Sequence, residues 1–185
     1  RHRTLPLYFS RVLSRVDYVS AKVAALTVGL MLVLGLPQVL LLVGNAVSTD
    51  DLTGYAKDNA GLFGPIFGAT ALVAFFMGTV SLFIASQTSR RAFATGAVLA
   101  YFVIMSIIGG ILVETTTGEV RQYVLLVSPI NVLEGAVYWI FSADWPNESD
   151  MAKAGLNGVY YVLVGLAYPL VALALLYRRF EKLAV

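Results

Sequence analysis

The 185-residue sequence has no cysteine, a single histidine and little charge. Without cysteine the chain has no disulfide, no thiol chemistry and no thiolate metal site. The lone His2 argues against a histidine-based metal site or catalytic triad. We therefore expect no metal ligands and no catalytic residues, so that the chain is not an enzyme in its own right.

Motifs for nucleotide and nucleic-acid binding are also missing from the sequence. It contains no GxxxxGK[ST] phosphate loop, no HExxH, no GxSxG and no glycine-rich dinucleotide fingerprint. No basic run is interleaved with aromatic residues, and the net charge is only +2, so we expect no nucleic-acid partner. Paired acids at Asp50–Asp51 and at Glu148 and Asp150 lie in loop-like stretches, which favours solvated charge over catalysis.

The sequence is rich in apolar residues and poor in charged ones. Hydrophobic residues make up 58% of the chain and charged residues 13%, against about 25% charged in soluble domains, and the mean hydropathy is +0.79. Four stretches have the roughly 20 apolar residues that a helix needs to cross a bilayer. The sequence thus predicts an all-α polytopic membrane protein, one transmembrane domain over 1–185 with spans at about 18–43, 61–87, 92–113 and 158–178.

The distribution of charge predicts the orientation of these spans. Ten of the 13 Lys and Arg residues fall on one side, and the positive-inside rule makes that side cytoplasmic. Both ends of the sequence and the QTSRR turn then lie in the cytoplasm, while nine of the eleven acidic residues lie outside. The ten cytoplasmic cations are Arg1, Arg3, Arg11, Arg15, Lys22, Arg90, Arg91, Arg178, Arg179 and Lys182.

The outer segment 114–157 is more apolar than a loop. Its VLLVSPINVLEGAVYWIF stretch is interrupted at Ser128-Pro129 and at Glu134, so neither half spans comfortably. We expect short re-entrant or interfacial helices; a fifth span is the competing interpretation, and it places the C-terminal cations outside. Glu114, Arg121 and Glu134 are flanked by apolar residues and either line an outer exit path or fix the short helices, the second being favoured.

Residues 4–16 predict a short cytoplasmic amphipathic helix. Thr4 can cap it, Pro6 suits its first turn, and its apolar residues recur at helical spacing. Such a helix lies on the inner membrane surface, where it binds anionic lipid or contacts a cytoplasmic partner, and periodicity alone favours lipid. Its apolar face holds Leu5, Tyr8, Phe9, Val12, Leu13 and Val16, and its polar face holds Ser10, Arg11, Ser14 and Arg15.

Four motifs, in order, carry a family resemblance. The stretch RTLPLYFSRVLSRVDYVSAK resembles the segment between the second and third spans of type-2 ABC exporter permeases. IASQTSRRAF resembles their inner turn between the fourth and fifth spans, SPINVLEGAVYWIF their outer short helices, and YRRFEKLAV their basic tail. The family usually has six spans, so the chain resembles the later two-thirds of that domain. By this resemblance either two spans precede Arg1 or the chain is a shorter relative.

The resemblance implies how such a chain works. In that family the first segment contacts an ATP-binding cassette ATPase subunit, which holds ATP and Mg²⁺, and two permease subunits work together. It also implies a bacterial inner membrane. By this resemblance the ATPase-contact residues are Leu5, Tyr8, Phe9, Arg11, Leu13 and Arg15.

Three functions follow as hypotheses. The first is an exporter permease that moves an apolar or amphipathic substrate with energy from a separate ATPase. The alternative is a non-transporting membrane scaffold or assembly factor that binds a partner or lipid through the N-terminal helix. A secondary transporter is disfavoured, because the apolar stretches of the predicted spans contain no Asp, Glu, Lys or Arg to bind or relay ions. These stretches are Val23–Val43, Gly61–Ser86, Ala92–Val113 and Gly158–Tyr177.

Overall fold

The computed structural model describes residues 15–182, with the side chains of 17–179. Within that range the chain is helical, and four helical stretches are long and apolar enough to cross a membrane, as the sequence predicted. They are Asp17–Val47 in α2 (Arg15–Val47), Leu52–Ala85, Arg91–Thr115 in α5, and Gly158–Arg179 in α9 (Gly158–Lys182). The second stretch joins α3 (Leu52–Asn59), the 3₁₀ turn η1 (Ala60–Leu62) and α4 (Phe63–Ala85).

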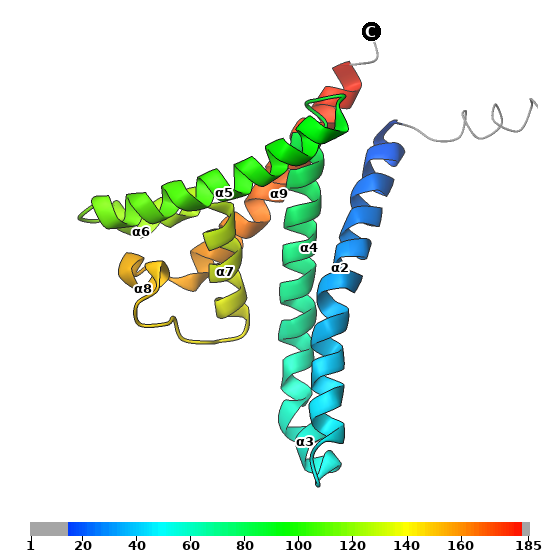
Figure 1. The fold of residues 1–185 in the computed structure, drawn as a ribbon, viewed down its shortest axis with the longest axis vertical. Coiled ribbons are helices and arrows are strands. Elements are labelled where there is room, and N and C mark those ends of the chain that lie inside the picture. The colour runs from blue at the N-terminus through cyan, green and yellow to red at the C-terminus, as the bar shows by residue number, and fades with distance from the viewer. Residues whose placement is uncertain (1–14, 183–185) are drawn as a thin grey trace, which may run out of the picture.

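The spans form two groups. Figure 1 shows α2 and α4 standing side by side, while α5 and α9 lean away from them. Helix α4 connects the two groups, since it packs on α2 and also on α5 and α9. The packing of α2 on α4 is close, because Gly78 of α4 has no side chain to hold the helices apart and an added Cβ there would lie 3.5 Å from the Leu26 Cβ of α2.

The segment after α5 folds into short helices, as expected. They are α6 (Arg121–Val124), η2 (Leu125–Val127), α7 (Pro129–Ile140) and α8 (Asp150–Ala154), and Figure 1 shows them grouped beside α5 and α9. The arm Arg121–Val127 and the helix α7 meet at a bend of 109°. The 12 residues of α7 reach only about 18 Å, well short of a bilayer core of about 30 Å. Residues 121–140 therefore form a sharply bent hairpin and not a straight fifth span.

Local chemistry fixes the bend at Ser128. A residue before proline avoids the helical region, and Ser128 is extended, with φ −87° and ψ 115°. Its Oγ accepts a hydrogen bond from the Asn131 N–H at 3.3 Å, and Pro129 occupies the first turn of α7, where its missing N–H costs nothing. The sequence Ser-Pro therefore ends one helix and starts the next.

The hairpin is held by a buried core. Leu125, Val132, Ala136 and Tyr161 are fully buried between the hairpin and α9. Gly135 lies against Tyr161 so closely that an added Cβ would come within 2.4 Å of the aromatic ring. The hairpin thus packs on α9 through a contact that only glycine permits.

Two adjacent glycines in α5 allow a test of how closely the hairpin packs on α5. A Cβ at Gly109 would lie 2.8 Å from the Ser128 Cβ, whereas a Cβ at Gly110 would meet only the Asp150 Oδ2 at an ordinary 3.6 Å. We expect Gly109→Ala to lower the free energy of unfolding by about 1–3 kcal/mol through overpacking. Gly110→Ala, the matched control, should be neutral or stabilise the helix by about 0.5–1 kcal/mol.

The measurement is thermal unfolding of both variants in the same detergent. Equal unfolding temperatures for Gly109→Ala and Gly110→Ala would show that the turn at Ser128 does not press on α5.

Candidate functional site

The predicted partner-contact helix lies mostly outside the described residues. Leu5, Tyr8, Phe9, Arg11 and Leu13 precede residue 15, and Arg15 is the first residue of α2. The structure does place the point at which this segment joins the bundle. The start of α2 packs on α9, because Val19 and Val23 of α2 form a buried cluster with Leu176 of α9.

Three chain segments meet at that end of the bundle, which we call the basic end: the start of α2, the turn 86–90 between α4 and α5, and the last turns of α9. The Arg179 guanidinium donates a hydrogen bond to the Gln87 Oε1, which ties α9 to the turn. The turn is also bonded within itself, since the Arg90 N–H donates to the Thr88 Oγ1 at 3.3 Å. The start of α2 therefore lies beside a positively charged surface that hydrogen bonds hold in place.

The opposite end of the bundle brings the predicted outer residues together. The Lys153 ammonium of α8 forms salt bridges with Glu114 of α5 and, at 3.7 Å, with Asp150. The hydrogen bond that the Lys153 ammonium donates to the Glu114 carboxylate is the main cause that raises the pKa of Lys153. Arg121 attracts Glu114 electrostatically, and Asp150 repels Glu134. The structure thus links Glu114 to Asp150 through Lys153, which sequence reasoning did not select. Arg121 and Glu134 form no salt bridge with another described residue.

These outer side chains are placed more for bracing than for binding a buried ligand. Glu114 and Lys153 are 59% and 36% exposed, and the Glu134 side chain also faces outward from α7. Their salt bridge joins α5 to α8 across 39 residues of sequence. The Arg121 Nε is buried and has no hydrogen-bond partner among the described residues.

The bend of the hairpin is held by a tyrosine of α9. The Tyr168 hydroxyl donates to the carbonyl oxygens of Leu126 and Val127, at 3.1 and 3.3 Å. These carbonyls lie at the end of a helical arm, where no N–H group of a following helical turn is available to donate to them. The Tyr168 hydroxyl supplies the missing donor, since a buried carbonyl without a hydrogen bond would be costly. Tyr168 precedes Pro169, a buried proline inside α9.

Two hollows lie along the spans. One, of about 420 Å³, opens between α2 and α4, and Gly35, Phe67 and Thr70 are among its lining residues. Between the same two helices, the Gln38 Nε2 of α2 donates a hydrogen bond to the Thr70 Oγ1 of α4 at 3.5 Å. Because almost all of its lining is apolar, the hollow suits hydrocarbon and not ions.

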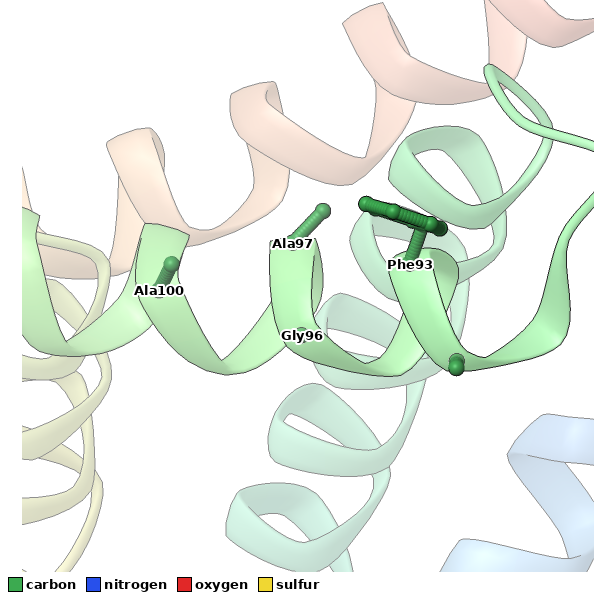
Figure 2. A pocket seen from close by; sticks show the side chains of 5 residues that line it. Phe93, Gly96, Ala97 and Ala100 are labelled. Atoms are coloured by element: carbon green, nitrogen blue, oxygen red, sulfur yellow. The ribbon is translucent and has the colours of Figure 1, made fainter.

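The other hollow, also about 420 Å³, lies on the surface of α5 near the basic end. Figure 2 shows Phe93, Ala97 and Ala100 pointing toward one side of α5, with Gly96 between them. Small residues at these positions leave the backbone open to close approach by another helix. The spacing 92, 96, 97 and 100 is visible in the sequence as a helical face, so this surface was predictable and was missed.

Comparison with known proteins agrees with the helical architecture. No curated protein and no solved structure matches the chain. A family model described as "ABC-2 family transporter protein" matches residues 2–184, nearly the whole chain. The resemblance that the four sequence motifs carried is thereby confirmed, and the apolar spans give the chain a place in the membrane. The chain belongs to the ABC-2 transporter family, as a transmembrane permease component.

Proposed function

We propose that this chain is the permease subunit of an ATP-driven exporter, powered by a separate ATP-binding cassette ATPase subunit. The observation that carries the proposal is the convergence at the basic end. The segment that resembles an ATPase-contact helix leads directly into α2, beside the turn 86–90 and the end of α9. A partner that pushes on this end acts on the ends of all four candidate spans at once.

The proposed orientation follows from charge. Lys22, Arg90, Arg91, Arg178 and Arg179 all lie at the basic end, which we assign to the cytoplasm. The ATPase then works in the cytoplasm, where ATP and Mg²⁺ are available, and the acidic outer segment faces the other side. We assign the protein to a bacterial inner membrane, with both ends of the sequence cytoplasmic.

Packing gives a route for force from the basic end to the hairpin. Helix α2 lies along α4, and α4 packs on α9 and α7. Phe76 of α4 is fully buried and its ring lies 5.5 Å from that of Tyr168, the residue that holds the bend of the hairpin. Movement of α2 and α4 against α5 and α9 would therefore displace the hairpin, which we propose as the outer gate.

The proposed substrate is apolar or amphipathic. The described spans expose aliphatic and aromatic side chains. The polar side chain that lines the hollow between α2 and α4, Thr70, is neutral and accepts a hydrogen bond from the neutral Gln38 amide. Hydrocarbon can lie against such a surface, whereas an ion would lose its hydration without gaining ligands. Glu114, Arg121 and Glu134 stand where an exported substrate would leave.

A second permease subunit is part of the proposal. The small-residue face of α5 around Gly96 and Ala97 lets a helix of another subunit approach closely, with Phe93 at its edge. An identical copy and a related chain would both fit this face. The membrane lipid that surrounds the pair is the remaining partner.

The ATPase contact is tested by the double variant Phe9→Ala/Arg11→Ala. It removes an apolar and a charged group from the predicted contact helix, so we expect at least a tenfold loss of substrate-stimulated ATPase activity and weaker co-purification of the ATPase. Buried anchors at such interfaces commonly contribute 2 kcal/mol or more, roughly 30-fold in affinity. Ser10→Ala, in the same helix, is the control and should change neither readout.

Full ATPase binding and full coupled activity in the double variant would reject the contact role. Purification of the natural protein with no ATPase, together with no nucleotide-stimulated transport in vesicles, would favour the membrane scaffold instead.

The outer salt bridge is tested by exchanging its charges. Because the pair is largely exposed, Lys153→Met should leave the unfolding temperature of the protein nearly unchanged. Hydrogen exchange in residues 141–157 should nevertheless rise, since α8 loses its link to α5. The charge-swapped variant Glu114→Lys/Lys153→Glu should slow hydrogen exchange again only in part, because the acid then at position 153 lies beside Asp150. Lys57→Met, in α3, should leave hydrogen exchange in residues 141–157 unchanged. Unaltered exchange in Lys153→Met would contradict a bracing role.

A further inference from the structure

Two hollows meet at the basic end and differ in chemistry. The first is a pocket of about 280 Å³ between α2, the end of α4, the turn 86–90 and α9. Lys22, Ser86, Thr88 and Arg179 give it a polar, cationic side, and Val19, Leu82 and Ala85 give it an apolar wall. Its volume is below the roughly 300–1,000 Å³ of sites for drug-sized ligands, so it suits a small headgroup.

The cations of this pocket have capacity left for an anion. Neither Lys22 nor Arg179 forms a salt bridge with another described residue. The Arg179 guanidinium uses part of its five donors on Gln87, and the Lys22 ammonium lies 4.9 Å from the centre of the Tyr18 ring. The Gln87 contact also fixes the direction of Arg179, which lowers the entropy cost of binding a ligand.

The hydroxyl groups add a donor. The Thr88 Oγ1 accepts a hydrogen bond from the Arg90 N–H, so its own O–H is free to donate. The Ser86 O–H is already used, since it donates to the Phe83 carbonyl at 2.7 Å. A guanidinium, an ammonium and one hydroxyl are the donors typical of a phosphate site.

The second hollow is a groove of about 340 Å³ that shares Leu82 and Ala85 with the pocket. It continues between α2, α4 and α5, where Leu26, Val98 and Leu99 line it. The groove is mostly apolar and extends along the spans away from the cations. Pocket and groove together therefore form one continuous surface that is cationic at one end and apolar at the other.

We propose that this surface binds one anionic phospholipid, with its phosphate in the pocket and an acyl chain in the groove. Basic pockets between spans at the cytoplasmic surface suit anionic headgroups. A free phosphate would occupy the pocket and leave the groove unused, and so would a carboxylate side chain of a partner subunit. The bound lipid joins α2, the turn and α9 at the end where the ATPase contact is proposed.

The test uses the natural full-length permease, purified in a neutral detergent and titrated with phosphatidylglycerol while its thermal unfolding is followed. Lys22→Gln/Arg179→Gln should weaken the apparent lipid affinity roughly 30-fold, because two cations are lost from the phosphate site. Arg91→Gln/Arg178→Gln removes the same charge from the same end but outside the pocket, and should retain the wild-type affinity. A loss of affinity that is equal in both double variants would overturn the proposal in favour of nonspecific surface charge.

A second pair of variants separates lipid from free phosphate. Ala94→Phe fills the groove and should weaken phosphatidylglycerol binding several-fold, whereas Ala24→Phe, on an exposed face of α2 outside the groove, should not. Phosphatidylcholine should stabilise the wild-type protein much less than phosphatidylglycerol, because it carries no net charge. Stabilisation by glycerol phosphate that equals that of the lipid, or an Ala94→Phe variant with unchanged lipid affinity, would overturn the proposal. Because lipid binding is measured by thermal stabilisation and not by transport or ATPase activity, these results do not depend on whether an ATPase drives the permease.

Discussion

A turn of non-helical backbone is buried in this protein at Ser128 and Pro129, and the position of every element after α5 depends on it. Lipid offers no hydrogen bonds, so such a turn is tolerated only where protein groups satisfy it. Here the Ser128 Oγ caps α7, and the Tyr168 hydroxyl of α9 bonds to the carbonyls of Leu126 and Val127. Gly109 of α5 leaves the space that the turn fills.

The turn at Ser128 and Pro129 links the two ends of the molecule. Because the hairpin reverses direction, α9 starts at the same end as α5 finishes and returns to the basic end beside the start of α2. Tyr168 in the middle of α9 holds the hairpin, and Arg179 near its end is bonded to the turn 86–90. One helix thus contacts both the proposed outer gate and the surface proposed to meet the ATPase and an anionic lipid.

The sequence alone predicted the parts of the fold that depend on composition and local pattern. The four uncharged apolar stretches predicted the spans, and Ser128-Pro129 predicted the break in the hairpin, since both signals are local. The family resemblance rested on ordered motifs and was confirmed by the match over residues 2–184.

Contacts between distant residues could not be predicted in the same way. Lys153 looked like one loop charge among several, and only the fold places it on Glu114, 39 residues away in sequence. Lys22 and Arg179 were counted for orientation alone, because nothing in their local sequence shows that both line one pocket. The residues Leu5 to Leu13 remain predicted partner contacts that lie outside the described part of the chain.

Because the chain has no native cysteine, single cysteines can measure directly whether the hairpin turns back. Thr49→Cys, Ser89→Cys and Glu148→Cys place one thiol each between α2 and α3, between α4 and α5, and after α7. A membrane-impermeant maleimide applied to intact cells should label positions 49 and 148, and should label position 89 only after permeabilisation. Labelling of position 148 together with position 89 would mean that residues 121–140 cross the membrane as a fifth span, and would contradict the account.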